Sequence, residues 1–345
     1  QTVVIKNKKK FKKYENLFKK KEIKYYFNIR EALNSLNKKV YYTINAISGI
    51  EGLEPTLQSI KYTKNIAIAN KESIICGWRL IKKQLKKCKT NFIPIDSEHF
   101  SIWNLLRNEN IKNIKKIYLT ASGGPFLNKS LNKVKNVNPS LALKHPKWSM
   151  GKKISIDSAT MMNKVFEVIE AKKIFDLVYN KFEIVIHPNS YVHSFINFKT
   201  GLIKFLAHET SMEIPIINSL HLPSEEFYYN AKNIDLKKLN ELSFLSPDHQ
   251  KFPLIKILNI IPNKESYFET ILVSLNDELV MKFLNRQINY ISIHLLLIKL
   301  IKHPYFTKYY NKYPNNINDI KNMVKIVKIF LNNFLKKNEN KKSKL

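Results

Sequence analysis

Cysteine is nearly absent from this 345-residue chain, and apolar runs long enough to cross a membrane are absent altogether. Cys76 and Cys88 form no C-x-x-C pair, which excludes a disulfide framework and a cysteine metal site and indicates a reducing compartment. The longest apolar run, 290–301, contains His294 and Lys299 and is too short to span a bilayer. No signal-peptide pattern opens the chain. These absences predict a soluble cytoplasmic protein with no membrane contact.

Acidic residues are also few, because 27 Asp and Glu oppose 59 Lys and Arg and leave a net charge of +32. Such a charge suggests nucleic-acid binding, and a basic nucleic-acid-binding protein is the rival hypothesis from another class. The lysines, however, are spread over the whole length and accompany abundant Asn, Ile, Tyr and Phe, which all have AT-rich codons. No zinc finger, RNP motif or basic-region heptad occurs in the sequence. We therefore expect a bacterial protein from an AT-rich genome rather than a plastid-type one, with no nucleic-acid partner and a positive field that attracts anionic substrates.

Alternating strand and helix patterns run through the first half of the chain. Strands are predicted at 39–47, 65–69, 91–95, 114–119 and 182–186. Helical patterns at about 54–61 and 71–87 separate the earlier strands, and this alternation predicts a parallel sheet. From about residue 250 the pattern is helical. Apolar residues of the last helix share one face through i, i+3, i+4 spacing: Ile317, Ile320, Val324, Val327, Leu331 and Phe334.

Asp96-Ser97-Glu98 stands where the predicted strand 91–95 ends. In an extended backbone residues i and i+2 point the same way, so Asp96 and Glu98 would direct two carboxylates at one point beside the Ser97 hydroxyl. Two converging carboxylates suit a hard cation such as Mg²⁺ or Mn²⁺. The plainer alternative, a solvated turn, is common for an Asp-x-Glu at a strand end.

Two loops carry residues suited to ligand binding. Ser122-Gly123-Gly124 follows a predicted strand, and small residues at such a position let backbone N–H groups approach an anion, although a plain tight turn is the ordinary interpretation. His145–Gly151 is a loop by its proline and glycine. Its Trp148 is either a surface anchor or a hydrophobic lid that excludes water.

The segment 157–167 is predicted to begin a helix, with Asp157 or Ser158 as its N-cap. A helix start together with Ser158, Asn163 and Lys164 predicts a phosphate site. Glu167, one turn beyond Lys164, would bring a third carboxylate to the cation. The alternative for Lys164 and Glu167 is an exposed i, i+3 ion pair.

Five motifs in this order resemble the 1-deoxy-D-xylulose 5-phosphate reductoisomerase family, and the resemblance covers essentially the whole chain. The motifs are Ala69–Ser73, Pro94–His99, Ser122–Phe126, His145–Lys164, and His187–Ser190 with His193-Ser194. The resemblance implies reduction and rearrangement of 1-deoxy-D-xylulose 5-phosphate to 2-C-methyl-D-erythritol 4-phosphate, in the methylerythritol phosphate route to isoprenoids. It also implies NADPH, Mn²⁺ or Mg²⁺, and a homodimer.

The resemblance implies an α/β fold with three regions. Residues 1–70 would be the remainder of an NADPH-binding Rossmann-like domain with a parallel sheet, 71–245 a catalytic α/β domain with metal site and lid, and 246–345 a C-terminal helical bundle. The family's chemistry is a metal-assisted rearrangement followed by hydride transfer from NADPH to the aldehyde.

Carried over by position, the resemblance implies metal ligands at Asp96, Glu98 and Glu167, and catalytic roles for Lys71, Glu98 and Glu167. The implied substrate contacts are Lys71, Ser97, Glu98, Ser122, His145, Trp148, Ser158, Asn163, Lys164, Glu167, Ser190 and His193. The implied NADPH contacts are Asn70, Glu72 and Gly151.

The sequence departs from the family in four places, one of which is Leu222, where the family usually carries a tryptophan. Ala121 and Val165 replace residues that are usually glycine, which should be tolerable. The family's Gly-rich dinucleotide loop is absent, so we expect either a fragment, which we favour, or a degraded gene, and weak NADPH binding by 1–345 alone. The alternative is therefore that the chain is a truncated or degenerate homologue, which binds the metal and the phosphate ligand without turnover.

Overall fold

The computed structural model describes residues 2–5, 8–130, 133–134, 137–146, 148, 150–220, 233 and 235–342. The chain divides into two compact units. The first comprises Gln1–Ser73 and Gly77–Ile93, and the second Ile74–Cys76 and Pro94–Leu345.

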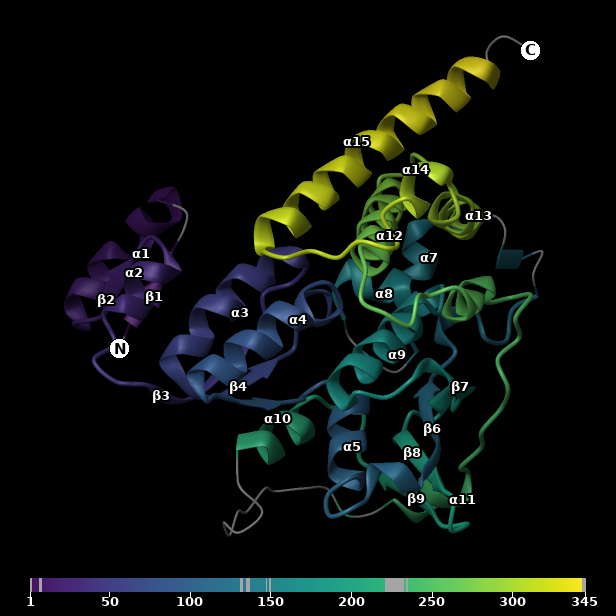
Figure 1. The fold of residues 1–345 in the computed structure, drawn as a ribbon, viewed down its shortest axis with the longest axis horizontal. Coiled ribbons are helices and arrows are strands. Elements are labelled where there is room, and N and C mark those ends of the chain that lie inside the picture. Colours follow the sequence, from purple (N-terminus) through teal and green to yellow (C-terminus); the bar gives the residue numbers. More distant parts are fainter. Residues whose placement is uncertain are drawn as a thin grey trace. The chain divides into compact units, whose positions relative to one another are not determined.

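The first unit contains two parallel sheets (Figure 1). In chain order its main elements are β1 (Thr2–Val4), α1 (Lys8–Lys20), β2 (Lys24–Tyr26), α2 (Ile29–Asn34), β3 (Val40–Asn45), α3 (Leu53–Ser59), β4 (Thr63–Ile68), α4 (Lys71–Cys88) and β5 (Asn91–Ile93). Strands β1 and β2 pair with each other, and the larger sheet has the order β3-β4-β5, so the predicted parallel arrangement is confirmed. Helix α4 packs closely on α3 at Gly77, where a β-carbon would lie 2.5 Å from a Leu53 methyl group.

The second unit is built on a four-stranded sheet of order β7-β6-β8-β9. Its strands are β6 (Ile114–Ala121), β7 (Phe182–Ile186), β8 (Val192–Phe198) and β9 (Ile203–Ala207). The strand predicted at 182–186 has the observed bounds. Strands β6 and β7 are parallel, whereas β8 and β9 add antiparallel neighbours, so this sheet is mixed.

One face of this sheet is covered by α5 (Ser97–Leu105) and α9 (Met162–Phe175). Ile117, Leu119, Val168 and Ile196 form a fully buried core there. The other face carries the cross-strand row Tyr118, Phe195 and Phe205, in which the Tyr118 and Phe195 rings stack 4.5 Å apart and Phe205 is exposed.

The predicted C-terminal bundle consists of α12 (Phe268–Leu284), α13 (Tyr290–Ile301), α14 (Pro304–Thr307) and α15 (Ile317–Lys342) (Figure 1). Ile320, Val327 and Leu331 of α15 are fully buried, as the apolar spacing predicts. At the start of the region predicted to be helical, Pro253–Asn259 forms a 3₁₀ helix and not an α-helix. No helix in the described residues is long and apolar enough to cross a membrane.

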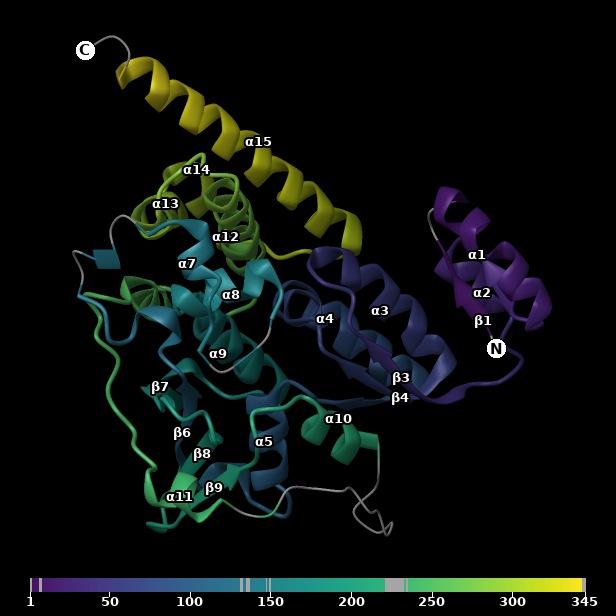
Figure 2. The same cartoon turned by 180° about the vertical axis from the view of Figure 1, so that it is seen from behind.

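Helix α8 (Lys152–Ala159) joins the bundle to the sheet region, and it lies near α12 in both views (Figures 1 and 2). The Asn276 amide of α12 donates to the buried Asp157 carboxylate at 2.7 Å. Lys153 also pairs with Asp157 at 2.9 Å, and the Tyr290 hydroxyl donates to the Ala159 carbonyl oxygen at 2.6 Å. These bonds fix the C-terminal end of α8. Further short helices of this unit are α7 (Pro139–Ala142), α10 (Glu213–Leu220) and α11 (Leu236–Asn240).

Candidate active site

The acidic motif lies at the start of a helix, which corrects the strand geometry expected for it. Strand β5 ends at Ile93, Asp96 is the extended residue before α5 (φ −61°, ψ 135°), and Ser97 and Glu98 are already helical. Asp96 makes no side-chain hydrogen bond that caps α5, while the Ser97 hydroxyl donates to Glu98 Oε2 at 2.7 Å. The two carboxylates therefore converge through helix-start geometry and not through the two-residue period of a strand.

The helix start predicted at Asp157 or Ser158 is also wrong. Both residues lie in the last turn of α8, and α9 begins only at Met162. Between the two helices Met161 adopts a left-handed backbone (φ 63°). This break places Ser158 at the end of one helix, with Asn163 and Lys164 at the beginning of the next.

Three acidic side chains meet beside Lys164. Carboxylate oxygens of Asp96, Glu98 and Glu167 all lie within 4.8 Å of one another. The Lys164 ammonium lies 2.7 Å from Glu98 Oε1 and 2.5 Å from Glu167 Oε2, and the Asn163 amide donates to Glu167 Oε1 at 2.5 Å. Donors that are all carboxylate oxygens fit a hard divalent cation such as Mg²⁺ or Mn²⁺.

The pair formed by Lys164 and Glu167 is buried, so the alternative of an exposed surface ion pair does not hold. Lys164 is 5% exposed and Glu167 1%. Burial alone would lower the pKa of the Lys164 ammonium, but the charges of Glu167 and Glu98 outweigh burial and raise that pKa above its usual value. Lys164 is therefore a permanent positive charge among the carboxylates.

The Ser122 turn packs against the end of α8. Gly123 and Gly124 both have positive φ values, 82° and 65°. A β-carbon on Gly124 would lie 3.1 Å from the Ser158 carbonyl oxygen, so glycine permits this approach. The close approach places Ser122 and Ser158, two candidate residues for phosphate binding, on adjoining segments.

His145 connects the Ser122 turn to the loop that carries Trp148. The Trp148 backbone N–H donates to His145 Nδ1 at 2.9 Å, and His145 Nε2 lies 3.1 Å from the Ser122 hydroxyl. Burial, and then the charge of Lys164, lower the pKa of His145 to about 4. The neutral ring accepts at Nδ1 and consequently donates from Nε2–H to Ser122. The Trp148 indole meets the His193 ring edge-on at 6.1 Å.

His193 and Ser190 are both buried in the second unit. The His193 ring stacks on His208 at 3.9 Å, and burial, followed by the charge of His208, lowers the pKa of His193 to about 3. Ser190 has a left-handed backbone (φ 51°), and its carbonyl oxygen accepts from Thr210. His187 is a core histidine whose Nδ1 lies 2.9 Å from the Ser243 carbonyl oxygen.

Asn70, Lys71 and Glu72 belong to the first unit. Asn70 caps α4 by accepting from the Ser73 N–H, and its amide also donates to the carbonyl oxygens of Ile47 and Gly49. Lys71 and Glu72 are the first two residues of α4. Gly151, in the second unit, is the exposed residue preceding α8.

Two buried residues next to the acidic cluster, His99 and Glu170, were missed by the sequence prediction. His99 is three residues after Asp96, and Glu170 is three residues after Glu167, so the helical i, i+3 spacing was available as a signal. Asp96, His99 and Glu170 form a second group whose ligand atoms lie within 4.8 Å of one another.

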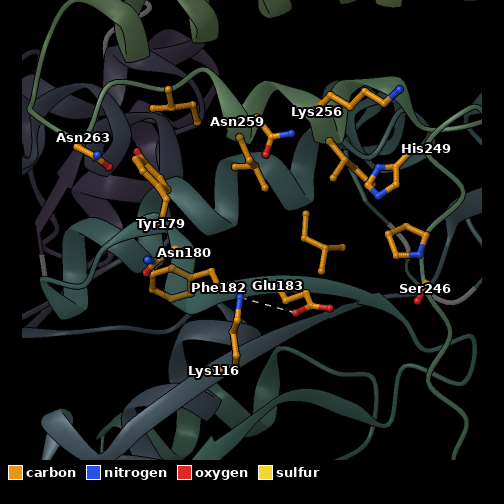
Figure 3. A pocket seen from close by; sticks show the side chains of 15 residues that line it. Lys116, Tyr179, Asn180, Phe182, Glu183, Ser246, His249, Lys256, Asn259 and Asn263 are labelled. Carbon is orange, nitrogen blue, oxygen red and sulfur yellow. Dashed lines mark ion pairs between the residues drawn. The ribbon is translucent and has the colours of Figure 1, made fainter.

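A separate hollow of about 550 Å³ lies beside β7 in the second unit (Figure 3). Tyr179, His249 and Asn259 line it, and Lys116 and Glu183 form an ion pair at its base with a separation of 3.9 Å. None of the described candidate site residues borders this hollow.

Three family models match successive parts of the chain. The model described as 1-deoxy-D-xylulose 5-phosphate reductoisomerase matches residues 1–77, and that enzyme's C-terminal domain model matches 92–175. A further model described as DXP reductoisomerase C-terminal domain matches 208–330.

Curated proteins with the name 1-deoxy-D-xylulose 5-phosphate reductoisomerase are similar over most of the chain. The Pelagibacter ubique protein is 56% identical over 300 residues, which are 86% of this chain and 77% of that protein. The protein of a Sulfurihydrogenibium species is 41% identical over 75% of this chain and 68% of its own length.

Solved structures of the same enzyme share the fold. The Zymomonas mobilis reductoisomerase in complex with NADPH has a TM-score of 0.84 and 29% identity, over 95% of this chain and 84% of that one. A DOX-P reductoisomerase crystal structure with NADPH, fosmidomycin and magnesium gives 0.83 and 31% identity over the same shares. These likenesses confirm the predicted α/β fold with its Rossmann-like parallel-sheet region and helical C-terminal part.

Proposed function

Because the chain belongs to the 1-deoxy-D-xylulose 5-phosphate reductoisomerase family, it catalyses the NADPH- and metal-dependent conversion of 1-deoxy-D-xylulose 5-phosphate to 2-C-methyl-D-erythritol 4-phosphate, and we propose that the chemistry takes place beside Lys164. The observation that carries this assignment is the group formed by the partly buried Asp96 and the buried Glu98 and Glu167 around that lysine. Burying charge is costly unless it is compensated, and Lys164 brings one positive charge to three carboxylates, so the charge of a divalent cation would favour this cluster.

Asp96, Glu98 and Glu167 are the proposed ligands of Mn²⁺ or Mg²⁺. When bound, the cation supplies Lewis-acid stabilisation of the negative charge that develops on the substrate oxygens. Ser97 supports the ligand set, because its hydroxyl donates to Glu98 Oε2 and orients that carboxylate.

Ser122, Ser158, Asn163 and Lys164 are the proposed phosphate contacts. Lys164 provides a fixed charge, and the hydroxyl and amide groups provide directed hydrogen bonds. The Ser122 oxygen accepts from the Gly124 N–H at 3.2 Å and from His145, which leaves the Ser122 hydroxyl hydrogen to donate to a phosphate oxygen.

The segment His145–Gly151 is the proposed lid. Trp148 would cover the substrate and exclude water, and its indole would pack edge-on against the His193 ring. His145 binds both the Trp148 backbone and the Ser122 hydroxyl, so movement of the lid would displace Ser122 at the proposed phosphate site. Ser190 would support the pocket from the loop before β8.

Asn70, Glu72 and Gly151 are the proposed NADPH contacts, and Lys71 is the proposed catalytic contact to the substrate. Asn70 holds the carbonyl groups of Ile47 and Gly49 and so shapes the loop after β3. By function we assign residues 1–70 to the NADPH domain, 71–245 to the catalytic domain and 246–345 to the bundle. The compact first unit itself continues to Ile93.

A homodimer is the proposed assembly, formed through the outer face of the mixed sheet. Phe205 and Ile203 of the edge strand β9 are 52% and 61% exposed, next to the Tyr118–Phe195 stack. An exposed apolar sheet face of this kind is typical of a surface that a second copy covers. We also propose a cytoplasmic location, in keeping with bacterial relatives and with two cysteines, Cys76 and Cys88, that form no disulfide.

The assignment is tested by following NADPH oxidation by the purified protein with 1-deoxy-D-xylulose 5-phosphate and Mn²⁺. Asp96→Asn should abolish turnover, while Lys116→Met, at an exposed ion pair beside the separate hollow, should leave turnover unchanged. Equal activity of Asp96→Asn and the unchanged protein would refute the proposed site.

A further inference from the structure

The buried ring of His99 lies between the two helices that carry the acidic cluster. Its Nε2 lies 2.9 Å from the backbone carbonyl oxygen of Glu167 on α9. Since a carbonyl oxygen only accepts, Nε2 carries the hydrogen and donates it. On the other side of the ring, Nδ1 lies 3.8 Å from Asp96 Oδ2 and 3.6 Å from Glu170 Oε2. His99 is therefore hydrogen-bonded to the backbone of one proposed ligand, Glu167, and lies within ion-pair distance of another, Asp96.

Glu170 is a second buried carboxylate on the same face of α9 as Glu167. It lies one helical turn later and is 2% exposed. None of the steps proposed above uses it. A carboxylate is costly to bury, so its position facing His99 calls for a role.

We propose that Glu170 is a positioning residue that acts through His99 to fix the separation of Asp96 and Glu167, and thereby sets the affinity for the divalent cation. This inference rests on the proposed ligand set. Asp96 precedes α5 and Glu167 lies within α9, so the two ligands keep their separation only if the helices are held together. Groups that orient metal ligands from outside typically change metal affinity by about 10–100-fold when mutated.

The test is Mn²⁺ binding to the whole protein, measured from the electron paramagnetic resonance signal of free Mn²⁺. Glu170→Gln keeps the shape of the side chain and should weaken Mn²⁺ binding by at least about tenfold, with one site per chain retained. Glu269→Gln is the matched control. Glu269 is also buried and faces α9, where it pairs with Lys173 at 3.0 Å, away from His99. That variant should lower the melting temperature but leave Mn²⁺ affinity unchanged.

A double variant tests whether Glu170 acts through His99. In a His99→Gln background, Glu170→Gln should add little further loss of Mn²⁺ affinity, because the connecting ring is already gone. Fully additive losses would overturn the proposed route. If Glu170→Gln does not fold, Glu170→Asp, which shortens the reach towards His99, provides the same comparison.

Two results would overturn the role of Glu170. One is unchanged Mn²⁺ affinity in Glu170→Gln. The other is two Mn²⁺ ions per unmodified chain and one in Glu170→Gln, which would make Glu170 a ligand of a second ion. Failure of the proposed ligand set is a separate outcome, recognised by normal Mn²⁺ binding in Glu167→Gln.

Discussion

Replacing Lys164 by methionine should destabilise the metal-free protein and at the same time strengthen its binding of divalent cations. The ammonium compensates Glu98 and Glu167 at 2.7 and 2.5 Å. Methionine has a similar length and no charge, so the carboxylates would remain buried without their positive partner. A divalent cation can supply that missing charge, and it would no longer compete with the ammonium for the same oxygens.

The size of the effect follows from the burial of the three side chains, which are at most 12% exposed. Removing one partner of a buried ion pair costs about 3–5 kcal/mol, because an uncompensated charge stays inside. In a domain of this size each kcal/mol shifts the melting temperature by about 2–4 °C, so Lys164→Met should melt about 10 °C lower. Mn²⁺ at about 100 times its Kd would restore about 2.7 kcal/mol.

The assay is thermal unfolding with EDTA and with Mn²⁺. Lys116→Met is the control, because Lys116 and Glu183 are 3.9 Å apart with side chains 36% and 52% exposed, and such pairs contribute at most about 1 kcal/mol. The reasoning is refuted if Lys164→Met melts at the temperature of the unmodified protein in EDTA. It is equally refuted if Mn²⁺ raises the melting temperature of Lys164→Met by no more than that of the unmodified protein.

Four further outcomes are expected. In an otherwise complete enzyme, Glu167→Gln should fold normally, by circular dichroism, yet reduce NADPH-dependent turnover at least about a hundredfold; near-normal turnover would remove Glu167 from the site. Trp148 fluorescence should change when a phosphonate hydroxamate binds with Mn²⁺, and a constant signal despite binding would count against a closing lid. The pKa of His145 is about 4 in the folded protein and 6.5 in the unfolded chain, so its contribution to stability is complete above pH 6.5 and is lost as the pH falls towards 4. In urea unfolding, His145→Gln should therefore lose less free energy of unfolding over that pH range than the unmodified protein. An identical loss would contradict the assignment. Phe205→Asp should yield monomers in analytical ultracentrifugation, and an unaltered dimer would exclude this sheet face.

The sequence predicted the elements whose signal is local. Strand β7 was predicted to the residue, and the buried face of α15 followed from apolar spacing. Strands β8 and β9 were not predicted. Strand β8 mixes His193, Ser194 and Asn197 with apolar residues, and Ser194 is buried because its hydroxyl donates to the Glu98 carbonyl oxygen. Such a polar residue is buried because tertiary contacts satisfy its hydrogen bonds. From the sequence alone it looks like a loop residue, and the strand is missed.

The residues of the candidate site were identified by their resemblance to the family motifs. Their arrangement in space could not be predicted from the local sequence. Extended geometry was expected for Asp96 and Glu98, but the helix begins one residue after Asp96. Their meeting with Glu167 depends on how α5 and α9 cover the same sheet, which is a long-range packing result. The burial of Lys164 has the same origin.

The bond between Asp157 and Asn276 has a consequence for exchanging parts between related proteins. The C-terminal helices look like a separable module, yet Asn276 holds the helix that ends beside Ser158. A chimera that imports foreign C-terminal helices therefore changes the surroundings of Ser158, the proposed phosphate contact, unless it also brings a donor to Asp157. Substrate affinity, rather than folding alone, should decide which grafts succeed.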